Sequence, residues 1–269
     1  MNIQEIVDDV VAGTPAVDWS IRIDDRAVHQ PERRLRTASV GKLLLLIETA
    51  RRIADGRLDP AGKLAKDPAL AVADSGLWQH LSVTELPVAD LAVLIAAVSD
   101  NYATNVLLGR VGLRPITDLA AELGLRDTAL LDFVRNARAR GDPATLSWGT
   151  AGELAGLMGG LARGTILSPE ISARVDSWLA TGVDLSMVAA GFDLDPLAHN
   201  EGDGGPVLRN KTGTDNGVRA DVGHVGLRPY AVLANWNPAH GDRTAAVMNG
   251  MRTIGRALAA DQPGRAALG

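Results

Sequence analysis

The sequence contains no cysteine, and lysine is scarce. Without thiols the chain has no disulfides, no thiolate metal ligands and no cysteine nucleophile, so covalent chemistry must be sought at serine. Only four of the 27 basic residues are lysines, and the others are arginines. Arginine stays protonated in proteins, so a step that needs a neutral amine falls to one of these lysines. They are Lys42, Lys63, Lys66 and Lys211.

Runs of positive charge are also missing. The net charge is −5, which disfavours nucleic acid as a partner, and we expect no membrane binding. Acidic residues lie among apolar ones at helical spacing in residues 1–11, which is typical of an amphipathic helix and not of a secretory signal. We therefore expect a cytoplasmic protein, or a secreted or periplasmic one if an export signal has been removed. The five histidines show no metal-ligand spacing, and we expect no metal and no cofactor.

Strand patterns lie at both ends of the chain and helical patterns fill its middle. We predict strands over residues 17–23, 27–35, 207–214, 218–227 and 230–236. We predict helices over 39–53, 88–98, 103–111, 116–123 and 243–260, and two more that begin after Thr150 and at Ser168-Pro169. Thr150 and Glu153 are expected to form a capping box. The segment 127–146 has no sustained period and reads as a long loop.

These elements predict an α+β fold in one domain, residues 1–269. An antiparallel sheet of about five strands would be built from both chain ends and flanked by helices. The sheet lobe would comprise about residues 1–38 and 206–269, and an all-helical lobe of about residues 55–190 would be inserted between them.

Ser39 and Lys42 stand three residues apart where a polar segment meets the apolar run 43–47. At a helix start both side chains would share one face, and burial would lower the lysine pKa enough for it to accept a serine proton. The spacing alone is weak evidence, because Ser39 could simply cap the helix and Lys42 could be solvated.

Two further motifs follow in order. Ser99-Asp100-Asn101 is expected between two helices, and Lys211-Thr212-Gly213 on a strand. With Ser39-Val40-Gly41-Lys42 they form the signature set of class A β-lactamases and penicillin-binding proteins. The chain resembles a class A β-lactamase-type serine hydrolase over essentially its whole length.

The resemblance implies a role for each motif. Ser39 would attack the carbonyl of an amide, ester or β-lactam, and Lys42 would take part as a base or in a proton relay. Ser99 would pass the proton to the leaving nitrogen, helped by Lys211, whose charge would also attract a substrate carboxylate.

The same resemblance implies a binding surface around these groups. Asn101 would orient an acyl-side amide, and Asp100 would brace its turn. The oxyanion hole would use the backbone N–H groups of Ser39 and Thr214. Thr212 and Thr214 would line the strand edge, and Arg219 is a second candidate carboxylate anchor or else an ordinary cross-strand arginine.

One family feature is missing, because segment 127–149 contains no glutamate to activate the deacylating water. Asp132 is the nearest carboxylate in the sequence, but its setting favours a bracing role, and Asn136 is a candidate to hold part of the loop. The sequence therefore predicts a serine acyl hydrolase with weak or altered β-lactamase activity. The alternatives are a penicillin-binding or sensing protein that does not turn over, and a D-Ala-D-Ala peptidase.

Overall fold

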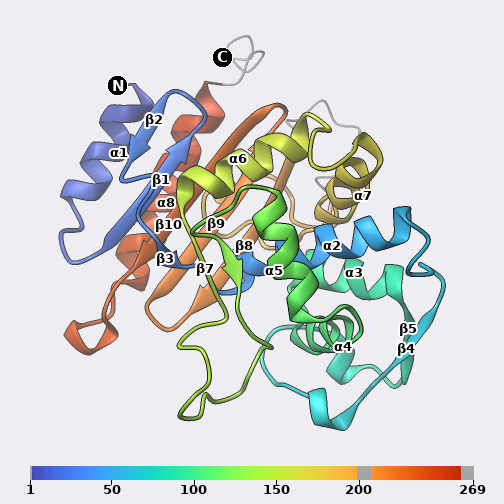
Figure 1. Cartoon of the computed structure of the whole chain (residues 1–269). Coiled ribbons are helices and arrows are strands. Elements are labelled where there is room, and N and C mark those ends of the chain that lie inside the picture. The colour runs from blue at the N-terminus through green and yellow to red at the C-terminus, as the bar shows by residue number, and fades with distance from the viewer. Residues whose placement is uncertain (1, 199–206, 262–269) are drawn as a thin grey trace.

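Strands from the two ends of the chain share one antiparallel sheet in the computed structural model, which describes residues 2–198 and 207–261 (Figure 1). The strand order is β2-β1-β10-β9-β8. The strands are β1 (Asp18–Ile23), β2 (Ala27–His29), β8 (Leu208–Asp215), β9 (Val218–Val225) and β10 (Arg228–Asn235). The predicted α+β fold is thus confirmed. The expected lobe boundary at residue 206 and the last residues, 262–269, lie outside the described residues.

Alternate residues of the sheet face two separate cores, as the two-residue period of a strand requires. Tyr230 and Val232 pack with helices α1 (Ile3–Ala12) and α8 (Thr244–Ala260). Ala231 and Leu233 pack into the core of the other helices, where α6 (Ala151–Ala162) lies directly on the sheet. Figure 1 shows α6 across one face of the sheet and α1 and α8 on the other.

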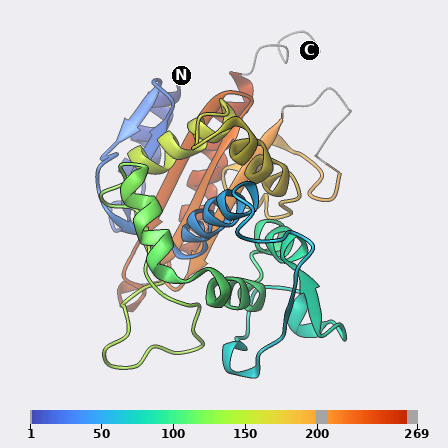
Figure 2. The same ribbon diagram turned by 45° about the vertical axis from the view of Figure 1, so that its right-hand side comes forward.

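Helix α2 (Lys42–Ala54) forms the centre of the helical part. Its residues 42–50 are all buried, because apolar side chains surround the helix and neighbouring helices pack on every side. Figure 2 shows α2 between the sheet and the outer helices. Those helices are α3 (Val88–Val98), α4 (Asn101–Val111), α5 (Leu113–Glu122) and α7 (Pro169–Leu179). None of the helices within the described ranges is long and apolar enough to cross a membrane.

The predicted strand 27–35 is wrong in its second half. Gln30 has a φ of 42° and Pro31 follows it, so the chain leaves the sheet after β2. Strand β3 (Leu35–Arg36) instead joins a small sheet with β7 (Ser147–Gly149) and β6 (Ala129–Leu130). Another pair, β4 (Lys63–Ala65) and β5 (Glu85–Pro87), lies in the segment expected to be purely helical. Strands of two or three residues are too short to show alternation in a sequence.

Several helix starts and one cap also differ from the prediction, and α5 begins at Leu113 and not at residue 116. Ser39 lies in a 3₁₀ turn, Ala38–Gly41, and the α-helix begins only at Lys42. Helix α4 begins at Asn101 because the Asp100 side chain caps it. The capping box before α6 is half formed, since the Glu153 carboxylate does not return to Thr150.

Candidate active site

Ser147 of β7 holds the turn that carries Ser39 through hydrogen bonds. The Ser147 hydroxyl donates to the Ala38 carbonyl over 2.6 Å and lies 2.7 Å from the Thr37 hydroxyl. This fixes Ala38 at a φ of 47°, in the left-handed region that non-glycine residues avoid. A Cβ on Gly41 would stand 2.4 Å from Ser147 Cβ, so this close packing requires glycine. The half-buried Ser39 is thereby presented on a rigid turn.

The amine of Lys42 is fully buried one turn after Ser39. Its Nζ lies 2.6 Å from the Ser99 carbonyl oxygen, 2.7 Å from Asn101 Oδ1 and 3.1 Å from Ser99 Oγ. Burial holds the pKa of Lys42 well below its ordinary value; the positive charge of Lys211 lowers it further, and Asp100 opposes the shift. The site therefore lowers the proton affinity of this amine.

The turn between α3 and α4 brings Ser99 and Asn101 to that amine. Ser99 has left-handed backbone dihedrals, with a φ of 55°. Asp100 is buried beneath it and accepts hydrogen bonds from the backbone N–H groups of Leu77, Trp78 and Ala103. The bracing role predicted for Asp100 is confirmed.

Asn101 connects Lys42 with the loop before α3. Its Oδ1 accepts from Lys42, and its Nδ2 donates to the Ala73 carbonyl over 3.1 Å. The Asn101 N–H also donates to Ser75 O. With both ends of its amide engaged, Asn101 has one orientation available.

Strand β8 runs along the other side of the site as the edge strand of the sheet. An edge strand has a row of backbone N–H and C=O groups that no neighbouring strand pairs. Gly213 lies against the Ser39 turn, because a Cβ on Gly213 would stand 3.2 Å from the Ser39 nitrogen. The Lys211-Thr212-Gly213 motif is thus brought next to the turn that carries Ser39.

Lys211 of β8 is buried, and its Nζ donates to the Thr212 carbonyl over 3.0 Å. Burial lowers the pKa of Lys211 to about 8, although the carboxylates of Asp184 and Asp221 act in the opposite direction. Lys211 and Ser99 line a common cavity of about 280 Å³. Lys42 and Lys211 are therefore both buried lysines of lowered pKa near Ser99.

Thr214 and Arg219 face each other across β8 and β9 at the outer end of the site. Thr214 is exposed. The Arg219 guanidinium donates to the carbonyls of Asp215 and Val218, and it lies 5.8 Å from the ring centroid of Trp236. The strand register thus places Arg219 at the rim of the site.

The loop of residues 127–146 carries an acid that is fully engaged elsewhere. Burial by itself would raise the pKa of Asp132, but hydrogen bonds from Arg135, the Phe133 N–H and Arg138 bring it below its usual value. The bracing role expected of Asp132 is confirmed.

Asn136 also holds the loop, because its Oδ1 accepts the Ala73 N–H over 2.8 Å. The base of the loop is fastened by Glu153, whose carboxylate accepts the N–H groups of Arg126 and Asp127. Helix capping was therefore the wrong explanation for the Glu153 carboxylate. Lys211 and Asp100 carry the two charges that act most on Lys42, and both residues lie outside this loop.

Two residues that shape the site were not predicted from the sequence. Ser147 lies just beyond the aperiodic segment 127–146, and only its tertiary contact with Ala38 reveals its role. Asp184 lines the cavity beside Lys211 and accepts a hydrogen bond from the Thr212 hydroxyl over 2.6 Å. Neither residue belongs to a recognisable motif, so no signal in the sequence indicated it.

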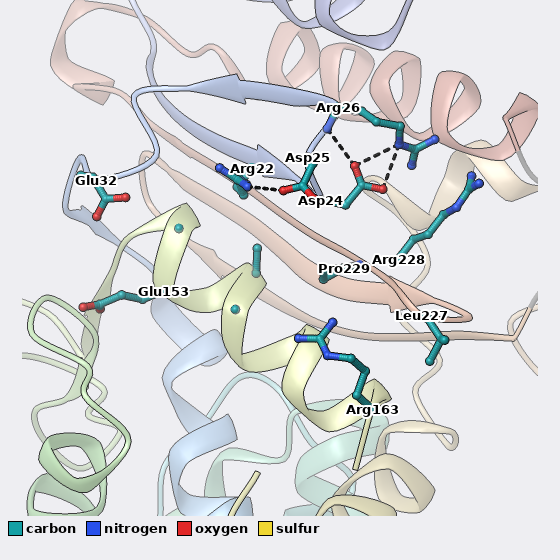
Figure 3. A pocket seen from close by; sticks show the side chains of 13 residues that line it. Arg22, Asp24, Asp25, Arg26, Glu32, Glu153, Arg163, Leu227, Arg228 and Pro229 are labelled. Carbon is teal, nitrogen blue, oxygen red and sulfur yellow. Dashed lines mark hydrogen bonds and ion pairs between the residues drawn. The ribbon is translucent and has the colours of Figure 1, made fainter. Parts of the chain in front are cut away.

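A larger hollow of about 720 Å³ lies elsewhere, between the β1–β2 turn and α6 (Figure 3). Its charged groups largely neutralise one another. Asp24 pairs with Arg26, and Asp25 pairs with Arg22 over 2.8 Å. None of the residues that line it belongs to the three motifs, whereas the smaller cavity at β8 is lined by Ser99, Lys211 and Thr212 from two of them.

Comparisons with known proteins agree with this geometry. The sequence matches the model of the beta-lactamase enzyme family over residues 2–261. The structure is similar to a beta-lactamase from Sphaerobacter thermophilus, with a TM-score of 0.81, 26% identity and 96% of each chain covered.

The fold is also similar to that of PBP-A, with a TM-score of 0.79 and 20% identity over 96% of this chain and 94% of that one. A mutant of PBP-A, described as an acyl-enzyme complex with penicillin G, gives a TM-score of 0.79 and 21% identity over 96% and 95% of the two chains. A comparison with curated proteins gives no significant match. On the family match and the shared fold, this chain is a serine hydrolase that belongs to the beta-lactamase enzyme family.

Proposed function

We propose that the protein is a serine acyl hydrolase that acts on an ester, amide or β-lactam through an acyl-Ser39 intermediate, with weak or altered β-lactamase activity. The observation that carries the proposal is the environment of Lys42, a buried amine of lowered pKa bonded to Ser99 and Asn101, one turn from Ser39. Such an amine is a suitable base for a serine hydroxyl.

The hydrogen bonds of Lys42 support a path for the proton. Two of its three partners are carbonyl oxygens, which only accept, and once the amine is neutral they can bind its two hydrogens. Ser99 Oγ both donates and accepts, and it is the partner that can exchange a proton with Nζ.

In the proposed acylation, Ser39 Oγ forms a bond to the substrate carbonyl carbon and its proton passes to Lys42. As the bond to the leaving group breaks, Ser99 donates its proton to the leaving atom and regains one from Lys42. Lys211, beside Ser99 in the cavity, favours that transfer through its positive charge.

We assign substrate binding to the edge of β8 and its surroundings. The Ser39 and Thr214 N–H groups would bind the oxyanion, and Gly213 supports this arrangement through its close approach to the turn. Asn101 would hold the acyl-side amide. Thr212 and Arg219 are the proposed contacts on the leaving-group side.

The loop acids give reason to consider a second function, a penicillin-binding protein that is acylated and does not turn over. Asp132 is bound by two arginines, and a carboxylate held in this way is a poor base for water. The PBP-A mutant, which has a similar fold, is itself described as an acyl-enzyme complex with penicillin G.

Intact-protein mass followed against time tests both functions. The protein is mixed with benzylpenicillin, a cephalosporin and an activated ester, with Ser39→Ala as the control. Product that accumulates without a lasting adduct supports the hydrolase, and an adduct that persists supports the acylated binder. If no compound gives an adduct or product that depends on Ser39, the proposal is wrong.

A further inference from the structure

Lys211, the positive group expected to receive a substrate carboxylate, already has a carboxylate of the protein near it, that of Asp184. Asp184 lies in the connection between α7 and β8 and lines the same 280 Å³ cavity as Ser99 and Lys211. It is half-buried, and its charge acts on the two groups of β8, Lys211 and Thr212, that a substrate carboxylate would meet.

Asp184 also occupies the hydroxyl that would donate to an anion. Its Oδ2 accepts from Thr212 Oγ1 over 2.6 Å. Its other oxygen, Oδ1, accepts from the N–H and the hydroxyl of Ser186, which fixes the orientation of the carboxylate. A bound anion would have to displace this arrangement or leave its own oxygens with fewer donors.

The carboxylate acts on Lys211 as well. Among charged groups, Asp184 is the strongest influence that raises the pKa of Lys211 against the effect of burial. The backbone of Asp184 is held in place, since its carbonyl accepts from Asn210 Nδ2 over 3.1 Å. The positive charge of Lys211 is thus balanced from within the protein.

We propose that Asp184 is a specificity-determining residue: as the internal counter-ion of Lys211 and Thr212, it makes the site discriminate against substrates that carry a carboxylate near the scissile bond and favour neutral ones. The inference rests on the proposed acyl transfer and specifies its substrate class. The physical reason is that a second carboxylate in the cavity repels the first and finds its donors already engaged.

The test compares two compounds that differ in that one charge, benzylpenicillin and its methyl ester. Acylation rates are measured by intact-protein mass, and the ratio of the acid rate to the ester rate removes differences in intrinsic reactivity between enzyme variants. Asp184→Asn retains an oxygen for the Ser186 N–H and removes the charge. We expect this variant to raise the acid-to-ester ratio by about tenfold, which corresponds to about 1.4 kcal/mol.

Asp195→Asn is the matched control. Asp195 is exposed in the same connection, and its Oδ1 also accepts the N–H two residues onward, from Leu197. The control removes the same charge and retains the same type of turn, so it should leave the ratio unchanged. If Asp184→Asn does not fold, Asp184→Ser supplies a hydroxyl for the same turn.

A second measurement separates this inference from the proposed catalysis. In the Ser39→Ala background, calorimetry gives the affinities of the acid and the ester with and without Asp184→Asn, and no reaction is required. A rise of about tenfold in relative affinity for the acid supports the role of Asp184 even if acylation fails. An unchanged ratio in the folded variant overturns the inference.

Discussion

A Cβ atom on Gly213 would stand 2.1 Å from the carbonyl oxygen of Thr37. The edge strand β8 and the turn that carries Ser39 therefore approach each other closely through backbone atoms, which are not flexible side chains that can move aside. The relative position of Ser39 and the β8 edge depends on this contact.

The first prediction is that Gly213→Ala separates these two elements. A displacement of about 1 Å in a catalytic arrangement costs about 100-fold in rate, so we expect at least that loss in acylation measured by adduct mass. Gly156→Ala is the control, because a Cβ there has no neighbour within 4 Å and Gly156 lies in helix α6. The control should keep its activity and gain about 0.5–1 kcal/mol in stability. Full activity in Gly213→Ala would show that the Ser39 turn and β8 can move apart without loss of acylation.

The second prediction concerns the support beneath Ser39. Ser147→Ala removes the hydroxyl that bonds Ala38 O and Thr37, which leaves the strained Ala38 backbone without its brace. We expect a loss of about 1–3 kcal/mol in the free energy of unfolding and a lower acylation rate. Ser177→Ala is the comparison, since its hydroxyl also donates to a backbone carbonyl, that of Arg174, but on an exposed helix face. Equal effects of the two substitutions on acylation would contradict a specific role for Ser147.

The third prediction separates a bracing role from a basic one at Asp132. Asp132→Asn weakens the charged hydrogen bonds from Arg135 and Arg138, and we expect it to cost about 2 kcal/mol in stability. The pKa of Asp132 lies below its usual value, so its contribution to stability is present above the ordinary carboxyl pKa and is lost as the pH falls through the lowered one. The lifetime of the acyl adduct should not change. An adduct that persists several times longer in Asp132→Asn would identify Asp132 as the deacylating base instead.

The sequence predicted most where a pattern repeats along an element. The five strands of the main sheet, the buried helix after Ser39 and the three motifs follow from periodicity and spacing, and the structure places Lys42, Ser99 and Gly213 around one turn. It predicted least where a role depends on one tertiary contact. The left-handed backbone at Gln30 splits a predicted strand, and its one local signal is the Pro31 that follows it.

Glu153 illustrates the same limit. Its position three residues after Thr150 fits a capping box, and the Thr150 hydroxyl does accept the Glu153 N–H. The carboxylate instead binds backbone N–H groups 26 and 27 residues away. Local spacing could not reveal this choice, because the partners lie at the base of a loop that the fold brings to the helix. Asp184 was missed for a similar reason.

The last prediction follows from the lowered pKa of Lys211, which is about 8 in the folded protein against an ordinary value of 10.5. Below pH 8 both folded and unfolded chains hold the proton, and the cost of burying the charge is fully present. Between pH 8 and 10.5 the unfolded chain binds more protons, so this residue makes stability rise with pH, by an amount of the order of 3 kcal/mol. Lys211→Met removes the titrating group and keeps an unbranched side chain. Urea titrations at pH 7 and pH 10.5 give the unfolding free energies of wild type and Lys211→Met. Relative to Lys211→Met, the wild type should therefore be more stable at pH 10.5 than at pH 7. If the two proteins show parallel pH dependence, Lys211 keeps its ordinary pKa in the fold, and the balance of charge between Lys211 and Asp184 must be revised.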